Sequence, residues 1–104
     1  MKIMKIQVLY LEGCPHHEGT LEVVRATARE LGTAIELEPV RVHAGSDLAR
    51  LRFLGSPTVL VDGVDVEPCA HARTDFAFGC RLYGSGGGVP PRDLILAALA
   101  RGDR

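Results

Sequence analysis

One cysteine and two histidines stand together in the segment Cys14-Pro15-His16-His17. A cysteine thiolate is both a nucleophile and a ligand for soft metal ions, and a nearby imidazole can transfer protons or bind metal. The segment therefore allows three roles for Cys14: a nucleophile, a metal ligand or an inert buried thiol.

The chain offers two pairs of potential metal ligands, Cys14-x-x-His17 and Cys69-x-His71. Together they supply four thiolate and imidazole ligands, enough for a tetrahedral zinc site if the two segments converge in the fold. The same thiols would hold a softer ion such as mercury in two-coordinate fashion. Because the Cys-x-His spacing is tighter than the usual zinc pair, plain solvent exposure is the alternative for His71. A metal-binding module therefore stays open beside thiol chemistry.

A strand followed by a helix would place Cys14 at the start of that helix. Residues 6–11 form a nearly continuous apolar run, which is typical of a central strand. Pro15 suits the first position of a helix, apolar residues recur at helical spacing up to Leu31, and Gly32 suits its C-terminal cap. The unpaired N–H groups and partial positive charge of a helix N-terminus lower the pKa of a nearby thiol. This position favours Cys14 as a functional nucleophile.

The rest of the chain predicts alternating strands and helices with a hairpin near its middle. Asp62-Gly63 is a strong hairpin signal. Pro39 lies within the predicted strand at 35–42 and implies an edge position or a bulge for it. The predicted elements are a strand at 35–42, a short helix at 47–54, hairpin strands at 58–61 and 64–66, and a helix ending at Gly102. Since a helix links the first two strands, they should pair in parallel. We expect an α/β fold with a mixed four-stranded sheet, in the order βαβαββα, and helices on both faces.

Composition limits the class of protein. With 104 residues, 46% hydrophobic and 24% charged, the chain predicts one soluble domain over 1–104, with an irregular insertion at 68–89 before the last helix. A net charge of −1 leaves no basic surface for nucleic acid, and no apolar run is long enough to cross a membrane. Residues 84–88 lack the context of a phosphate loop, so we expect a flexible connector and no cofactor. Three cysteines and no cleavage site favour a cytoplasmic protein without a disulfide scaffold.

Several motifs together resemble the thioredoxin superfamily. These are a strand ending in Gly13-Cys14-Pro15, a helix starting at the cysteine, and Ser56-Pro57-Thr58 just before a hairpin. The segments LEGCP, FLGSPTVLVDGVDVEP and CRLYG are most similar to small bacterial thioredoxin-like proteins, some of which carry an alkylmercury lyase label. The resemblance covers nearly the whole chain apart from residues 68–89. It implies a thioredoxin-like three-layer α/β/α sandwich, a cis peptide bond before Pro57, and Pro57 packed beside Cys14.

The CPHH segment departs from the Cys-x-x-Cys motif of thioredoxins, whose second thiol resolves the mixed disulfide formed by the first. With His17 at the second position, either a distant cysteine resolves or the chemistry is monothiol. Cys80 and Cys69 are the candidates, and the resemblance at CRLYG favours Cys80. We therefore expect a thiol-disulfide oxidoreductase, or a binder of soft electrophiles, that acts on protein or small-molecule thiols and disulfides.

In this interpretation Cys14 is the nucleophile, Cys80 resolves, His17 is a nearby proton donor, and Pro57 presents backbone to an extended partner. The alternative is a metal- or mercury-binding module without redox activity, which would use Cys14, Cys69, Cys80 and the histidines.

Overall fold

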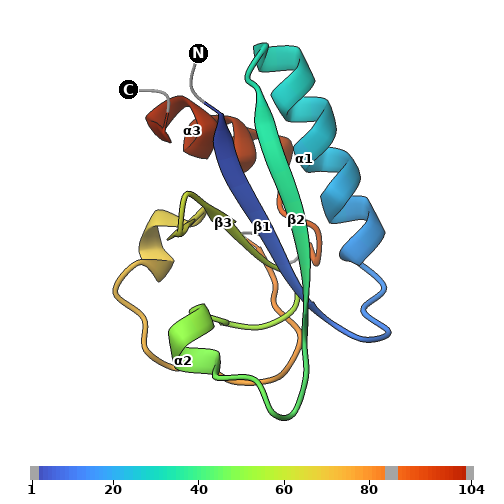
Figure 1. Ribbon diagram of the computed structural model, residues 1–104, viewed down its shortest axis with the longest axis vertical. Helices are drawn as coiled ribbons and strands as arrows, with labels where there is room; N and C mark the ends of the chain where they lie inside the picture. Colours follow the sequence, from blue (N-terminus) through green and yellow to red (C-terminus); the bar gives the residue numbers. More distant parts are fainter. Residues whose placement is uncertain (1–2, 84–86, 103–104) are drawn as a thin grey trace.

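The apolar run near the start of the chain forms β1 (Met4–Leu11), an inner strand of a four-stranded sheet. The computed structural model describes residues 3–83 and 87–102 (Figure 1). After β1 come α1 (His17–Leu31), β2 (Ile35–Val42), α2 (Leu48–Leu51), β3 (Thr58–Val61), β4 (Val64–Asp65), the 3₁₀ helix η1 (Pro68–Ala70) and α3 (Arg92–Gly102). The predicted α/β fold with a mixed four-stranded sheet is therefore confirmed. Residues 84–86 of the predicted flexible connector lie outside the described residues.

The sheet is mixed, with the strand order β2-β1-β3-β4. β1 runs parallel to β2, with Met4 opposite Ile35 and Leu11 opposite Val42, as the helical connection between them predicts (Figure 1). β3 is antiparallel to both β1 and β4. β2 is an edge strand, so Pro39 removes no hydrogen bond that a further strand would need.

One face of the sheet packs against α1 and α3. Because side chains alternate along a strand, Ile6 and Val8 of β1 point to the same face, and Val61 and Val59 of β3 lie opposite them. These residues form one core with apolar side chains of the two helices: Leu21, Val24 and Ala28 from α1, and Ile95, Ala98 and Leu99 from α3. This core anchors α1 against β1 and so sets the position of the turn that joins them.

The opposite side chains of the sheet pack under α2. Leu9 and Leu60 form a second cluster with Phe53, which is fully buried, and with Leu48 and Leu51 of α2. α2 spans only four residues, shorter than the predicted helix at 47–54. It ends early because Arg52 adopts a left-handed conformation, with φ of 58°, and Phe53 turns into the core. At its start the Asp47 side chain caps the helix by accepting a hydrogen bond from the Arg50 N–H.

The segment predicted as irregular contains η1 and two isolated bridges. Residues 73–77 have no regular structure, and the bridges pair Ser56 with Cys80 and Tyr83 with Gly87. Among residues 3–83 and 87–102, no helix is both long enough and apolar enough to span a membrane.

Candidate functional site

Cys14 lies in the turn between β1 and α1, two residues before the helix cap. Its N–H donates to the Leu11 carbonyl at 3.1 Å, and Gly13 takes a φ of +81°, which a residue with a side chain rarely adopts. The prediction that α1 begins at Pro15 is wrong by two residues. His16, with φ of −104° and ψ of 0°, is the cap, and the first bond of the helix runs from the Thr20 N–H to the His16 carbonyl. The Cys14 side chain is half-buried and so is not sealed in the core.

Cys14 and Cys80 line the same pocket. The pocket has a volume of about 170 Å³ and lies between the β1–α1 turn, the loop before β3 and the segment around Cys80. Its lining comprises residues 11–16 together with Ser56, Gly79 and Cys80. Two cysteines that are far apart in the sequence therefore line one small hollow at the end of β1.

Ser56 joins the three segments that form this pocket. Its hydroxyl oxygen accepts a hydrogen bond from the Leu11 N–H at 3.0 Å, which ties the loop before β3 to the end of β1. Its backbone N–H donates to the Gly79 carbonyl at 2.8 Å, and its carbonyl accepts from the Arg81 N–H at 3.0 Å. The backbone on both sides of Cys80 is therefore bound to Ser56, so Cys80 is held beside the Cys14 turn.

The peptide bond between Ser56 and Pro57 is cis, as the resemblance implies. Pro57 itself is buried, and its carbonyl accepts a hydrogen bond from the Tyr83 hydroxyl at 2.5 Å. That Pro57 presents backbone to an extended partner stays a prediction, and within the chain its carbonyl is bound by Tyr83. The protein's own residues 79–83 already bind the backbone polar groups of this loop, because they pack along it.

His16, and not His17, lies at the pocket. The His17 ring stacks on Tyr10, with ring centroids 3.7 Å apart and an angle of 13° between the planes, and it does not line the pocket. Its Nε2 atom is buried and has no hydrogen-bond partner in the part of the chain that the structure describes. His16 does line the pocket, and its ring packs so closely against Gly88 that a side chain at position 88 would clash with it.

The residues of the predicted zinc site do not come together. Cys69 lies exposed in η1, and the Nε2 atom of His71 is 2.7 Å from the carbonyl of Asp65. Neither residue lines the pocket that holds Cys14. Within residues 3–83 and 87–102, no group of three or more His, Cys, Asp or Glu side chains could hold a metal ion. The four-ligand site with Cys14, His17, Cys69 and His71 is therefore not formed.

A larger hollow of about 370 Å³ adjoins the pocket of the two thiols. It shares Leu11 and Glu12 with that pocket and extends along Val42 to Phe78, whose side chain is about half exposed. Arg41 and His43 add positive or titratable groups to its wall. An apolar group next to a reacting sulfur would find its contacts here.

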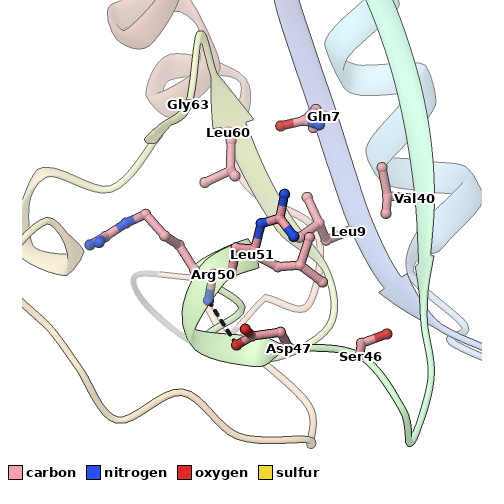
Figure 2. Close-up of a pocket in the computed structure, with 10 residues that line it drawn as sticks. Gln7, Leu9, Val40, Ser46, Asp47, Arg50, Leu51, Leu60 and Gly63 are labelled. Atoms are coloured by element: carbon pink, nitrogen blue, oxygen red, sulfur yellow. Dashed lines mark hydrogen bonds between the residues drawn. The ribbon is translucent and has the colours of Figure 1, made fainter.

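A larger pocket, of about 410 Å³, lies away from the thiols, between the sheet and α2 (Figure 2). Figure 2 shows Leu9, Leu60 and Leu51 on its walls and the hydrogen bond from the Arg50 N–H to Asp47 at its edge. Its lining includes no cysteine or histidine, so it offers no thiol. We place the candidate site at the smaller pocket because that one holds the reactive side chains.

Comparisons of the chain with models of known protein families, with curated proteins and with solved structures found no match. The geometry of the Cys14 pocket therefore carries the functional argument.

Proposed function

We propose that this protein is a thioredoxin-like thiol redox domain in which Cys14 is the nucleophile and Cys80 is the resolving cysteine. The observation that carries the proposal is that Cys14 and Cys80 line one pocket, although they lie in distant parts of the sequence. The segment Cys14-Pro15-His16-His17 lacks the second thiol of a Cys-x-x-Cys motif. In this proposal Cys80, from a distant part of the sequence, resolves the mixed disulfide instead.

The arrangement of the elements supports a thioredoxin-like three-layer sandwich. The sheet order β2-β1-β3-β4, the parallel pairing of β1 with β2 and the antiparallel hairpin fit that fold. Apolar clusters on the two faces of the sheet, one with α1 and α3 and one with α2, are also expected of it. The cis peptide bond before Pro57 adds to this agreement.

The proposed reaction has two displacement steps. The Cys14 thiolate attacks one sulfur of a substrate disulfide, which forms a mixed disulfide and releases the other sulfur as a thiolate. The Cys80 thiolate then attacks the Cys14 sulfur, which forms the Cys14–Cys80 disulfide and releases the second substrate thiolate. The substrate gains two electrons and the protein loses two. An external thiol or dithiol reductant, of the kind that keeps cytoplasmic thiols reduced, restores the starting state by the reverse exchange.

His16, and not the predicted His17, is the histidine that we propose as a proton donor in this site. His16 lines the pocket with both thiols, whereas His17 is stacked on Tyr10 outside it. An imidazolium beside the pocket can protonate the departing thiolate, which is released into the same hollow.

Peptide mapping tests the pairing directly, because trypsin separates the three cysteines. The expected peptides are residues 6–25 with Cys14, residues 53–73 with Cys69, and residues 74–81 with Cys80. The reduced protein is incubated with oxidised glutathione, quenched with acid, alkylated and digested without reductant. We expect a disulfide between the peptides of Cys14 and Cys80.

Two cysteine variants supply the matched comparison. Cys80→Ser should accumulate the mixed disulfide of Cys14 with glutathione, because no thiol is left in the pocket to displace it. Cys69→Ser removes another exposed cysteine, which does not line the pocket, and should behave like the natural chain. A disulfide from Cys14 to Cys69, or a Cys80→Ser protein that releases glutathione as fast as the natural chain, would contradict the proposal.

The same pair of thiols favours a second function, the binding of a soft ion such as Hg²⁺ by two sulfur ligands. In this function the pocket holds the ion and no electrons are exchanged. The Cys69→Ser protein should then retain one Hg²⁺ per chain against excess glutathione, and Cys80→Ser should lose it. Equal retention by the two variants excludes the pair as the binding site.

A further inference from the structure

Arg81, the residue after Cys80, is buried with its side chain only 3% exposed. Its two terminal nitrogens, Nη1 and Nη2, each donate to one carboxylate oxygen of Asp65 at 2.8 Å. Nη2 also donates to Glu67 at 2.8 Å, and Nη1 lies 3.3 Å from the Thr58 hydroxyl. Arg81 is thus bound by a two-pronged ion pair and a second carboxylate, which is the strongest geometry that an arginine forms with acidic groups.

The partners of Arg81 belong to the β3–β4 hairpin, away from the segment that carries Cys80. Asp65 is in β4, opposite Leu60 of β3, and its side chain is also 3% exposed. The Arg81 guanidinium stands 4.5 Å from the centre of the Tyr83 ring. We call Arg81, Asp65, Glu67 and Tyr83 the Arg81 cluster. Its ion pairs and hydrogen bonds join the segment around Cys80 to Asp65 and Glu67, while the cation–π contact with Tyr83 lies within the segment itself.

The charge of Arg81 is well compensated by this cluster. Burial by itself lowers the pKa of the guanidinium, but the hydrogen bonds to Asp65 and Glu67 outweigh it, so the pKa lies above its usual value. Burial raises the pKa of the Tyr83 phenol above its usual value, and the nearby Arg81 charge opposes part of that rise. Arg81 therefore stays positively charged, and Tyr83 stays a neutral donor to the Pro57 carbonyl.

Gly55 allows Arg81 to approach the loop before β3. A methyl group at position 55 would lie 3.0 Å from the Arg81 Cβ atom, and the φ of +119° at Gly55 also disfavours a side chain. The backbone hydrogen bonds of Ser56 to Gly79 and Arg81 run beside this contact. The absence of a side chain at Gly55 thus lets the Cys80 segment dock closely enough for these bonds to form.

Cys80 itself is exposed, and the preceding residues 73–77 have no regular structure. The contacts that hold the Cys80 segment in place are therefore those of its neighbours, and the buried ones centre on Arg81. A buried ion pair is weak evidence for stability, because the cost of desolvating its charges offsets much of the attraction. Its strict geometry instead makes it suited to fixing the position of a segment that no helix or strand supports.

We propose that the Arg81 cluster is a positioning device that holds the thiol of Cys80 at the Cys14 pocket for the second displacement step. This inference rests on the proposed redox function of the two cysteines. Arg81 is a positioning residue: it touches neither Cys14 nor the substrate in this scheme. It raises the effective concentration of Cys80 at Cys14 and so favours the internal disulfide over two glutathione adducts.

The test measures the equilibrium between the dithiol and the Cys14–Cys80 disulfide in glutathione buffers of graded redox ratio. All proteins carry Cys69→Ser, so that only the two pocket thiols react. The variants are Arg81→Gln, which removes the charge, Arg81→Lys, which keeps the charge but not the two-pronged geometry, and Glu67→Gln, which leaves the pair with Asp65 intact. The matched control is Arg73→Gln, because Arg73 forms a similar two-pronged pair with Asp75, but an exposed one.

We expect the equilibrium constant for the disulfide to fall about tenfold or more in Arg81→Gln, which is about 30 mV for two electrons. Arg81→Lys should restore part of this loss, Glu67→Gln should show a smaller fall, and Arg73→Gln none. A residue that stabilised both redox forms equally would leave the constant unchanged, so the measurement separates positioning from stability. If Arg81→Gln does not fold in reductant, the decision rests on Arg81→Lys and Glu67→Gln.

The failures of the two proposals are distinguishable. If the Cys69→Ser protein forms no Cys14–Cys80 disulfide at any glutathione ratio, the redox function is overturned and this inference with it. If that disulfide forms, and folded Arg81 and Glu67 variants keep its equilibrium constant, only the positioning role is overturned. A fall as large in Arg73→Gln as in Arg81→Gln also overturns it.

Discussion

Replacement of Asp65 by asparagine should destabilise the reduced protein, because it leaves Arg81 buried with one of its two carboxylates missing. Asparagine has the shape of aspartate but no charge, so packing is preserved. It has one acceptor oxygen in place of two, and its NH₂ group would then face an Arg81 nitrogen that is also a donor. Asp65 Oδ1 also accepts a hydrogen bond from the Glu67 N–H. The asparagine oxygen must take this place, so its NH₂ group must take the place of Oδ2, which faces Arg81 Nη1.

The size of the effect follows from the burial of the pair. Both side chains are 3% exposed, and breaking a buried ion pair by removing one partner typically costs about 3–5 kcal/mol. Glu67, whose side chain is 15% exposed, still compensates part of the Arg81 charge, so we expect the lower end, about 3 kcal/mol. Adding Arg81→Met should recover part of this loss, since the unpaired charge is then removed as well.

Urea unfolding followed by far-ultraviolet circular dichroism at pH 7 in reductant measures the loss. The chain has no tryptophan and two tyrosines, which makes the backbone signal the better probe. With a urea dependence of about 1–3 kcal/mol per molar, the midpoint should fall by about 1–3 M. Asp75→Asn, which breaks the exposed pair with Arg73, is the control and should not shift the midpoint measurably. A loss in Asp65→Asn below about 1 kcal/mol, the value typical of exposed pairs, would refute the reasoning.

Three further substitutions test other parts of the structure. Tyr83→Phe removes the hydrogen bond to the Pro57 carbonyl and should cost about 1–2 kcal/mol at pH 7. Burial raises the pKa of Tyr83 in the folded state, so the folded protein holds that proton more tightly than the unfolded chain does. The natural chain should therefore lose stability above about pH 10, and the difference in free energy of unfolding between it and Tyr83→Phe should narrow. A difference that stays constant up to pH 11 in urea unfolding would contradict this. Phe53→Ala empties the fully buried centre of the cluster under α2 and should cost about 3–5 kcal/mol in the same assay, whereas a loss below about 1 kcal/mol would mean that this cluster is loosely packed. Gly32→Ala places a side chain at a φ of +73° at the end of α1, where nothing crowds it, and should cost about 1 kcal/mol; an unchanged or higher Tm would show that the cap tolerates this strain.

Much of the fold follows from local patterns that the sequence displays openly. The apolar run at residues 6–11, the helical spacing up to Leu31 and the Asp62-Gly63 turn each predict their element, and the structure contains all three. Where the predictions are wrong, a competing local contact decides. α2 ends at Leu51 because Arg52 turns left-handed. α1 begins at His17 because the turn after Cys14 extends through the predicted first helical residue, Pro15.

The site was only partly visible in the sequence. Cys14 stood out because it follows a strand and precedes a helix, and Cys80 was chosen on a resemblance. The CPHH spacing predicts His17 as the proton donor, whereas His16 lies at the pocket, because a difference of one residue at the start of a helix turns a side chain about 100° around its axis. Arg81 was overlooked, since an arginine in an irregular segment is most often exposed.

The sequence by itself determined the order of strands and helices and the position of the cysteine turn, since these depend on contacts between residues a few positions apart. Only the tertiary structure decided that Cys80, and not Cys69, lies at the pocket of Cys14. That outcome depends on contacts between three segments that are distant in the sequence, residues 55–58, 65–67 and 79–83. Ser56 binds the backbone of Gly79 and Arg81, and Arg81 forms a buried ion pair with Asp65 and Glu67. No local propensity encodes such contacts, because each forms only after the sheet has brought the two segments together.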